Sequence, residues 1–295
     1  MRIVLTGATG RIGAYLRDPL IRRGWSVVPW AGASRGSWAG EACVQVDLAD
    51  PLATEQALDR DDPDVVLHAA AVSDAEQARR DPIRAHAINV EAVACIAAWC
   101  AAKGRRLVFT STDMVFDGGE PWTSEAAEPR PILAYGRTKQ EAEREARKAP
   151  DVAVARISLL YGPTRCGRET FYDKAVAKLR AGEPQAFFDD EFRTPLDYGS
   201  AAEILVALAG SDFRGVVHVG GVERLSRYEL MSRVARGLGF DPSLVHANSR
   251  ADAAFAEPRP ADLSLDTSRL AALFPDLGRP PVEEAVRAMA AGSGG

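Results

Sequence analysis

The sequence predicts an α/β fold built on a doubly wound parallel sheet. Through the first half of the chain, short apolar runs of strand length alternate with longer stretches of helical character. Such β-α-β-α alternation is typical of a parallel sheet with helices on both faces. After Tyr161 the alternation breaks down, which predicts a second, smaller and discontinuous α/β unit.

Strands and helices of the first half follow one another in regular order. Strands are expected at residues 2–6, 25–30, 43–46, 64–69, 106–110 and 152–160, and helices at 12–23, 85–103 and 135–148. The run at 64–69 is continuous and apolar, as a strand covered on both faces should be. Gly24 and Gly104 directly follow two of the helices, which is typical of helix ends.

The second half is less regular. Helices are expected at 171–181, 201–209 and 228–238, and a strand at 216–219. Residues 195–208 resemble a strand-turn-helix unit of the first half, so the helix at 200–209 is expected to pack back on the first domain. The predicted division is a first domain of residues 1–161 and 193–214, and a discontinuous second domain of residues 162–192 and 215–295.

Composition argues against several classes of protein. The 295 residues carry a formal net charge of -5 without a basic stripe, which argues against a nucleic-acid partner. The four cysteines and four histidines lack metal-ligand spacing, so we expect no metal site and mostly buried, reduced thiols. The N-terminus does not resemble a signal peptide, and the apolar runs look too short to span a bilayer. We expect a soluble cytoplasmic protein with no membrane partner, and a homodimer is compatible with the sequence.

Three glycines lie between the first strand and the first helix. Gly7, Gly10 and Gly13 allow a tight turn and a close approach of the backbone to a phosphate. The N-terminus of the following helix offers free N–H groups to the same anion. This strand-turn-helix context predicts a dinucleotide site and, with the parallel sheet, a Rossmann-type fold.

The end of the second strand bears on which dinucleotide binds. Sites for NAD usually place a carboxylate there, against the ribose 2′-hydroxyl, and this chain has Ala31 and no acid nearby. Ser34 and Arg35 could instead hold a 2′-phosphate, although Arg35 could also be a solvated loop residue. NADP(H) is therefore the preferred cofactor and NAD(H) the alternative. Asp47, after the third strand, could accept a hydrogen bond from the adenine amino group.

Tyr135 and Lys139 lie four residues apart on a predicted helix, so their side chains share one face. A tyrosine hydroxyl can protonate the alkoxide that forms when hydride reaches a carbonyl, and a neighbouring lysine cation lowers the pKa of that tyrosine. Thr112 follows the fifth strand, at the sheet end where ligands bind. Its hydroxyl could polarise the carbonyl or merely support a turn.

Together these residues resemble the extended short-chain dehydrogenase/reductase superfamily. Within it, the chain looks most like the dTDP-4-dehydrorhamnose reductases. The stretches that carry this closer resemblance are 111–118, 135–139, 215–221 with 226–229, and 259–267. The resemblance implies an NAD(P)H-dependent reductase of a keto-sugar nucleotide in which Thr112, Tyr135 and Lys139 are catalytic.

The motifs and the resemblance together give two sets of site residues. Those expected at the cofactor are Gly7, Thr9, Gly10, Arg11, Ile12, Gly13, Ser34, Arg35, Asp47, Leu48, Ala69, Ala70, Ala71, Asn89, Thr110, Tyr135 and Lys139. Those expected at the substrate are Ser73, Thr112, Asp113, Val115, Arg193 and Arg259.

One loop, residues 189–195, departs from the reductase pattern. Relatives have Asp-Gln and then a glycine before Pro-Thr, whereas this chain has three consecutive acids, Asp189, Asp190 and Glu191, and no glycine. Because this loop touches substrate in relatives, the sugar and the nucleotide both stay open. Arg193 in the same loop could contact a phosphate or pair with Asp189 or Glu191.

Other functions on the same fold remain open. A 4,6-dehydratase would need an acid where this chain has Met114, which argues against dehydration. An epimerase is compatible with the motifs. The regulatory subunit of methionine adenosyltransferase resembles the same branch and works as a binding partner. An intact set of Thr112, Tyr135 and Lys139 favours an enzyme over that binding role.

Overall fold

The computed structural model describes residues 1–32, 36–255 and 257–292. Its centre is a parallel sheet of seven strands in the order β13-β8-β7-β6-β1-β2-β5. The strands are β1 (Arg2–Thr6), β2 (Ser26–Ala31), β5 (Val44–Gln45), β6 (Val65–His68), β7 (Arg106–Thr112), β8 (Val152–Ile157) and β13 (Gly215–Val219). The predicted doubly wound sheet is confirmed.

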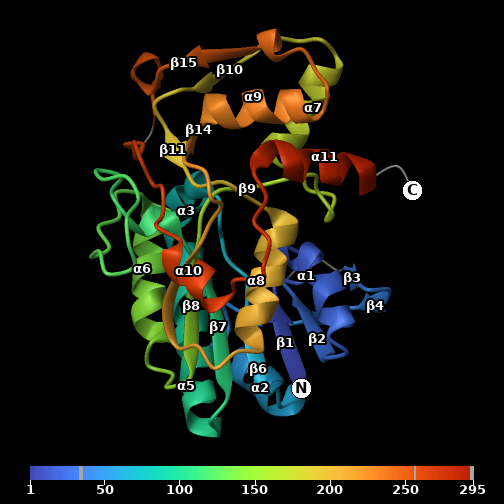
Figure 1. The fold of residues 1–295 in the computed structure, drawn as a ribbon. Helices are drawn as coiled ribbons and strands as arrows, with labels where there is room; N and C mark the ends of the chain where they lie inside the picture. The colour runs from blue at the N-terminus through green and yellow to red at the C-terminus, as the bar shows by residue number, and fades with distance from the viewer. Residues whose placement is uncertain (33–35, 256, 293–295) are drawn as a thin grey trace.

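Helices cover both faces of this sheet (Figure 1). One face carries α1 (Arg11–Arg22) and α8 (Tyr198–Ala209), and the other carries α2 (Pro51–Asp61), α5 (Ala92–Lys103) and α6 (Ala134–Ala146). The expectation that residues 200–209 pack back on the first domain is confirmed, because Leu205 and Leu208 of α8 share a core with Leu16 and Leu20 of α1. The strand order turns back between β1 and β6, and such a switch point opens a ligand crevice at the carboxyl ends of the strands.

The helix predicted at 85–103 is longer and less uniform than expected. It runs as α4 (Pro82–His86), a π-helical segment η1 (Ala87–Glu91) and then α5. The run Pro82–Lys103 is long and apolar enough to cross a membrane, so the expectation that every apolar run is too short was wrong. Half of its most apolar window is buried, and Val93, Ile96 and Cys100 pack into the core on one face of the sheet, as in a core helix.

A second hydrophobic core lies beyond the carboxyl ends of the strands, at the top of Figure 1. It contains side chains of α7 (Phe171–Arg180), α9 (Arg227–Gly237) and α11 (Val282–Gly292), next to the parallel pair β10 (Gln185–Phe188) and β15 (Val245–Asn248). Capping boxes at Thr170 and Ser226 start α7 and α9. We propose that this unit, with its own hydrophobic core, is the smaller second domain that the sequence predicted.

One boundary of that division was wrong. The strand β13 was expected in the second domain, but it pairs in parallel with β8 and completes the central sheet. Its Val217 and Val219 are fully buried and share a core with residues of α8 and α1. Hydrophobic burial therefore assigns this strand to the first domain.

The remaining described elements are short. They are β3 (Ser37–Trp38), β4 (Glu41–Ala42), β9 (Leu160–Tyr161), β11 (Phe192–Arg193), β12 (Leu196–Asp197), β14 (Leu225–Ser226), α3 (Ala75–Arg80), α10 (Ser268–Leu273), η2 (Asp113–Val115), η3 (Pro242–Leu244) and η4 (Arg250–Asp252). The four cysteines are free thiols, but only Cys100 is buried, so the expectation of mostly buried thiols was wrong for Cys43, Cys95 and Cys166.

Candidate active site

The glycine turn joins β1 to α1 and is packed too tightly for side chains. Gly7 has φ +67°, and a Cβ placed on it would lie 2.8 Å from the amide nitrogen of Ala70. A Cβ on Gly13 would lie 2.2 Å from the carbonyl oxygen of Gly7. Gly10 is the N-cap of α1, and no side chain of the described residues caps this helix start. The start of α1 can therefore receive an anion, as a dinucleotide site requires.

Thr6 fixes the neighbouring strand end against this turn. Its Oγ1 accepts hydrogen bonds from the amides of Ala69 and Ala70, both at 3.1 Å, and lies 3.0 Å from Nδ1 of His68. Burial, together with the charge of Lys139, lowers the pKa of His68 to about 3, so its ring is neutral. Ala69, Ala70 and the following Ala71 thus lie beside the glycine turn with no long side chain to exclude a cofactor.

The other residues expected at the cofactor differ in their exposure and in their contacts. Asp47 is exposed, with its Oδ1 accepting from the amide of Ala49 at 3.1 Å, whereas Leu48 is buried. Thr110 donates to the carbonyl oxygen of His68 at 3.1 Å and so links β7 to β6. Ser34 and Arg35 lie outside the described residues.

Thr112 ends β7 and begins the short helix η2. Its Oγ1 accepts from the amide of Met114 and donates to Oδ1 of Asp113, both at 3.3 Å. The Asp113 carboxyl is 2% exposed, receives the Ser158 hydroxyl at 3.2 Å and lies 3.4 Å from Nε of Arg193. Burial nevertheless raises the pKa of Asp113, since desolvation outweighs these partners.

Tyr135 lies in the first turn of α6, beside η2. Gly136 allows this contact, because a Cβ there would lie 2.1 Å from the carbonyl oxygen of Met114. Burial raises the pKa of Tyr135, and the charge of Asp113 raises it further. The hydroxyl therefore keeps its proton, which is the form that a proton donor needs.

Lys139 lies one turn further along α6 and is 1% exposed. Its Nζ lies 4.0 Å from the centroid of the Phe109 ring. Burial lowers the pKa of Lys139 from 10.5 to about 7, with the Glu143 carboxylate acting in the opposite direction. The sequence predicted that the lysine cation would lower the pKa of Tyr135. In this structure desolvation dominates both groups, so the lysine is only partly charged near pH 7 and the tyrosine pKa is raised.

Glu143, one turn after Lys139, ties α6 to two strands. Its carboxylate, 1% exposed, accepts from the Ser111 hydroxyl at 2.6 Å and from the Arg156 guanidinium at 2.9 and 2.8 Å. Sequence reasoning did not find this network, because Ser111, Glu143 and Arg156 carry no motif of their own.

Three further predicted residues differ in how they relate to the site. Asn89 is buried. Its Oδ1 accepts from the amide of Val72, and its Nδ2 donates to the carbonyl oxygen of Val72 and to the Thr138 hydroxyl, so it positions α6. Ser73 is exposed just past the end of β6. Val115 is fully buried in an apolar cluster with Phe116 and Leu263, so the structure does not bring its side chain to the site.

An arginine cluster, Arg193, Arg227 and Arg259, surrounds the fully buried carboxylate of Glu191. Nε of Arg227 lies 3.2 Å and Nη2 of Arg259 lies 2.6 Å from that carboxylate, and Nη2 of Arg193 lies 3.7 Å away. Although burial alone would raise it, the three cations lower the pKa of Glu191. With Asp113 beside Arg193, three guanidinium groups face two carboxyl groups, so the cluster retains a net positive charge suited to an anion.

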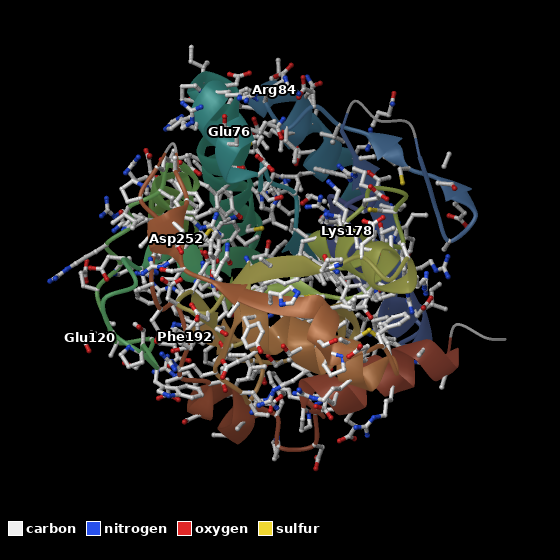
Figure 2. All side chains as sticks on the ribbon, turned by 90° about the horizontal axis from the view of Figure 1, so that it is seen from above. Glu76, Arg84, Glu120, Lys178, Phe192 and Asp252 are labelled. Atoms are coloured by element: carbon white, nitrogen blue, oxygen red, sulfur yellow. The ribbon has the colours of Figure 1, made fainter. Side chains whose placement is uncertain are left out.

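The arginine cluster reaches both the catalytic end of the sheet and an aromatic pair. Arg193 joins it to Asp113, and thereby to Thr112. Arg259 lies 5.5 and 4.9 Å from the ring centroids of Phe188 and Phe255, which pack edge to face. In Figure 2, which looks down on the second domain, Phe192 lies on the same side of the molecule as Asp252 and Glu120, with Lys178 of α7 across from it.

Sequence reasoning found only part of this cluster. Arg193 and Arg259 were predicted, and Arg193 pairs with Glu191 and not with Asp189. Glu191 as the centre and Arg227 as the third cation were missed, because β11, α9 and the loop at 259 meet only in the folded chain. In the part of the chain that the structure describes, no three His, Cys, Asp or Glu side chains form a metal-ligand group.

Known proteins match most of the length of the chain. Residues 1–293 match the family model described as RmlD substrate binding domain. The chain is 32% identical over 272 residues to the dTDP-4-dehydrorhamnose reductase of Mycobacterium tuberculosis, covering 89% of this chain and 83% of that protein. It is 28% identical over 296 residues to methionine adenosyltransferase 2 subunit beta of Danio rerio, covering 97% of this chain and 89% of that protein.

A solved structure agrees with these relatives at the level of the fold. The dTDP-4-dehydrorhamnose reductase of Bacillus anthracis, determined in complex with NADP, superimposes with a TM-score of 0.86 at 22% identity and covers 99% of both chains.

Proposed function

The chain belongs to the RmlD substrate binding domain family, and from this premise we propose that it is an NADPH-dependent reductase of a nucleotide-linked keto sugar. The candidate substrate is dTDP-4-dehydrorhamnose, on which the mycobacterial relative is named to act. We place the reaction in the cytoplasm, where the four free thiols would remain reduced.

The observation that carries this proposal is the meeting of β7, η2 and α6 at the carboxyl end of the sheet. It places the hydroxyl residues Thr112 and Tyr135 on packed neighbouring elements, with Lys139 one turn beyond the tyrosine. The glycine turn of the same sheet supplies a cradle for the dinucleotide phosphates. A hydroxyl pair beside a dinucleotide cradle is suited to carbonyl reduction.

Each catalytic residue has a proposed role. A bound NADPH would supply the hydride that reduces the carbonyl carbon. Tyr135 donates its proton to the carbonyl oxygen, so that the C=O group becomes CH–OH. Thr112 donates a hydrogen bond to the same oxygen as negative charge develops there. Lys139 holds the nicotinamide ribose, and an anion bound nearby would favour its charged form.

We assign the nucleotide part of the substrate to the second domain. The arginine cluster has the charge to bind a diphosphate, and an arginine fork matches phosphate geometry. Phe188 and Phe255 lie beside Arg259, where an aromatic face can stack on a base. This arrangement would hold the sugar between the cluster and Tyr135.

NADPH is proposed in preference to NADH because no acid follows β2 before residue 36. The binding role of the methionine adenosyltransferase subunit is the second candidate, since that relative covers 97% of this chain. An enzyme is favoured because the catalytic hydroxyls and Lys139 are all present and packed together.

The test is a direct assay of turnover. Purified protein is mixed with dTDP-4-dehydrorhamnose and either NADPH or NADH, and the absorbance of the reduced nicotinamide is followed at 340 nm, a wavelength at which only the reduced form absorbs. We expect oxidation that depends on the sugar nucleotide and is faster with NADPH. No oxidation with any keto-sugar nucleotide, combined with binding to a methionine adenosyltransferase catalytic subunit, would replace this proposal with the binding role.

A further inference from the structure

We propose that Arg168, on a loop far from the glycine turn in sequence, is a determinant of cofactor choice that binds the ribose 2′-phosphate of NADPH. The inference rests on the proposed dinucleotide site and adds to it a residue that no motif indicates. It also makes a loop at the start of the second domain part of the cofactor site.

The loop at residues 162–170 lies across the glycine turn and α1. Tyr15 donates its hydroxyl to the carbonyl oxygen of Pro163 at 2.6 Å, and Arg11 donates to the carbonyl oxygen of Glu169 at 3.2 Å. Arg168 completes the contact, because its Nη2 donates to the carbonyl oxygen of Thr9 at 2.7 Å. The loop is thus held against the turn by contacts at both of its ends.

A cavity of about 800 Å³ lies between this loop and the β3–β4 hairpin. Its lining includes Thr9 and residues of α1, Gly36 and Trp38 of the hairpin segment, and Arg165 and Arg168 of the loop. Trp38 holds the hairpin in place, since its indole N–H donates to the carbonyl oxygen of Gly13 at 3.1 Å. The cavity is therefore part of the dinucleotide turn and not a separate surface hollow.

The position of Thr9 identifies which part of a dinucleotide would lie here. A Cβ on Gly36 would lie 2.6 Å from Cγ2 of Thr9, so the backbone at Gly36, just before β3, lies directly against this residue. In dinucleotide sites the residues that follow the second strand contact the ribose 2′-position. Arg168 bonds to the backbone of the same residue and lines the same cavity as Gly36, so its guanidinium is available to a 2′-phosphate bound there.

The charges lining the cavity favour an anion. Arg17 and Arg165 share one carboxylate, that of Asp18, each at 3.0 Å. Among the described residues, Arg168 lies within ion-pair distance of no carboxylate. Burial alone would raise the pKa of the neighbouring Cys166 thiol, but hydrogen bonds with the Arg168 backbone, the Thr164 hydroxyl and the Arg168 side chain lower it, with a smaller contribution from the Arg168 charge. Three guanidinium groups thus face one carboxylate.

The guanidinium of Arg168 favours a phosphate over a hydroxyl as its ligand in this cavity. One arginine N–H is used on Thr9, and the planar fork keeps further donors for phosphate oxygens. A charge-assisted pair of this kind contributes on the order of tenfold or more to affinity. NADH has only a 2′-hydroxyl there and would gain little from the cation.

The test uses binding, so it does not depend on turnover. Dissociation constants are measured by calorimetry for 2′-phospho-ADP-ribose and ADP-ribose, which lack the nicotinamide, and for NADPH and NADH. Wild type is compared with Arg168→Ala, Arg168→Lys and a control, Arg180→Ala, at an exposed position on α7. Arg168 is itself exposed, and thermal unfolding checks that each variant is folded.

We expect Arg168→Ala to weaken binding of the two 2′-phosphorylated ligands by about tenfold or more and of the other two by less than about twofold. Lysine should restore part of the loss, and Arg180→Ala should change nothing. Equal weakening of all four ligands would show that Arg168 only holds the loop, and unchanged binding would also overturn the proposal. If wild type binds 2′-phospho-ADP-ribose through Arg168 yet reduces no sugar nucleotide, the proposed function fails while this inference stands.

Discussion

The two ends of the candidate active site are built in different ways. At the sheet end, Thr112, Tyr135 and Lys139 lie on consecutive elements, and burial dominates their electrostatics. In the arginine cluster, by contrast, separate segments bring their charges around Glu191. The comparison teaches that the proposed catalytic side chains are positioned by the local backbone of neighbouring elements. The arginine cluster proposed to bind substrate is instead held together by ion pairs between distant segments.

The largest expected effect is at the sheet end. Tyr135→Phe removes the proposed proton donor and should lower kcat by on the order of 10²-fold or more, the usual scale for a positioned general acid. Folding and the dissociation constant for NADPH should change little, because the ring and its packing remain. Single-turnover kinetics with calorimetry separate these quantities.

Tyr172→Phe is the matched control, because Tyr172 is buried in the core of the second domain and should keep wild-type turnover. If Tyr135→Phe reduced the best substrate at the wild-type rate, the proposed mechanism would be wrong and the binding role would become the better explanation.

A smaller and different effect is expected from the arginine cluster. Arg259→Met should raise KM for the nucleotide sugar about tenfold, since one charge-assisted contact to a phosphate is lost. The kcat should stay within about threefold, and NADPH affinity should not change. Glu191 keeps Arg193 and Arg227 as partners, so the fold should survive.

Steady-state kinetics of Arg259→Met are compared with those of Arg287→Met, which removes an exposed arginine of α11. A fall in kcat without a rise in KM would place Arg259 in the chemistry and would remove the contrast between the two ends.

The same contrast explains what the sequence could predict. Gly7, Gly10 and Gly13 and the Tyr135–Lys139 pair are local patterns, because a turn or one helical turn alone sets their geometry. The place of β13 depends on which core buries Val217 and Val219, and that is decided only by the whole fold. Glu191 and Arg227 were missed for the same reason, since no spacing in the chain brings them together.

The electrostatics of the sheet end were predicted only in part. The sequence shows that Tyr135 and Lys139 share a helix face, but not how completely each is buried. Desolvation is set by the packing of η1, η2 and β7 around them. Desolvation therefore raises the pKa of Tyr135, where the sequence predicted a lower one. No pattern in the sequence indicates this burial.

The smallest expected effect concerns stability, and it tests whether burial of Lys139 is unfavourable to folding. The pKa of Lys139 is about 7 in the folded chain, against 10.5 for an ordinary lysine. Between these values the unfolded chain holds a proton that the native chain releases, so the wild-type free energy of unfolding rises with pH in this window. Below about pH 7 the full penalty of burying the charge is present.

Lys139→Met keeps a side chain of similar length without this titration, while losing the contact with the Phe109 ring. The variant should melt a few degrees above wild type at pH 7, and the difference should shrink as pH rises toward 10. Turnover should nevertheless fall, because the variant loses the lysine that is proposed to hold the nicotinamide ribose. Such a residue serves catalysis at the expense of stability. Melting temperatures from pH 6.5 to 9.5 measure this, with the exposed Lys148→Met as control. A difference that stays constant over this pH range, or a less stable variant at pH 7, would show that Lys139 is charged and well paired in the native state, as the arginines around Glu191 are.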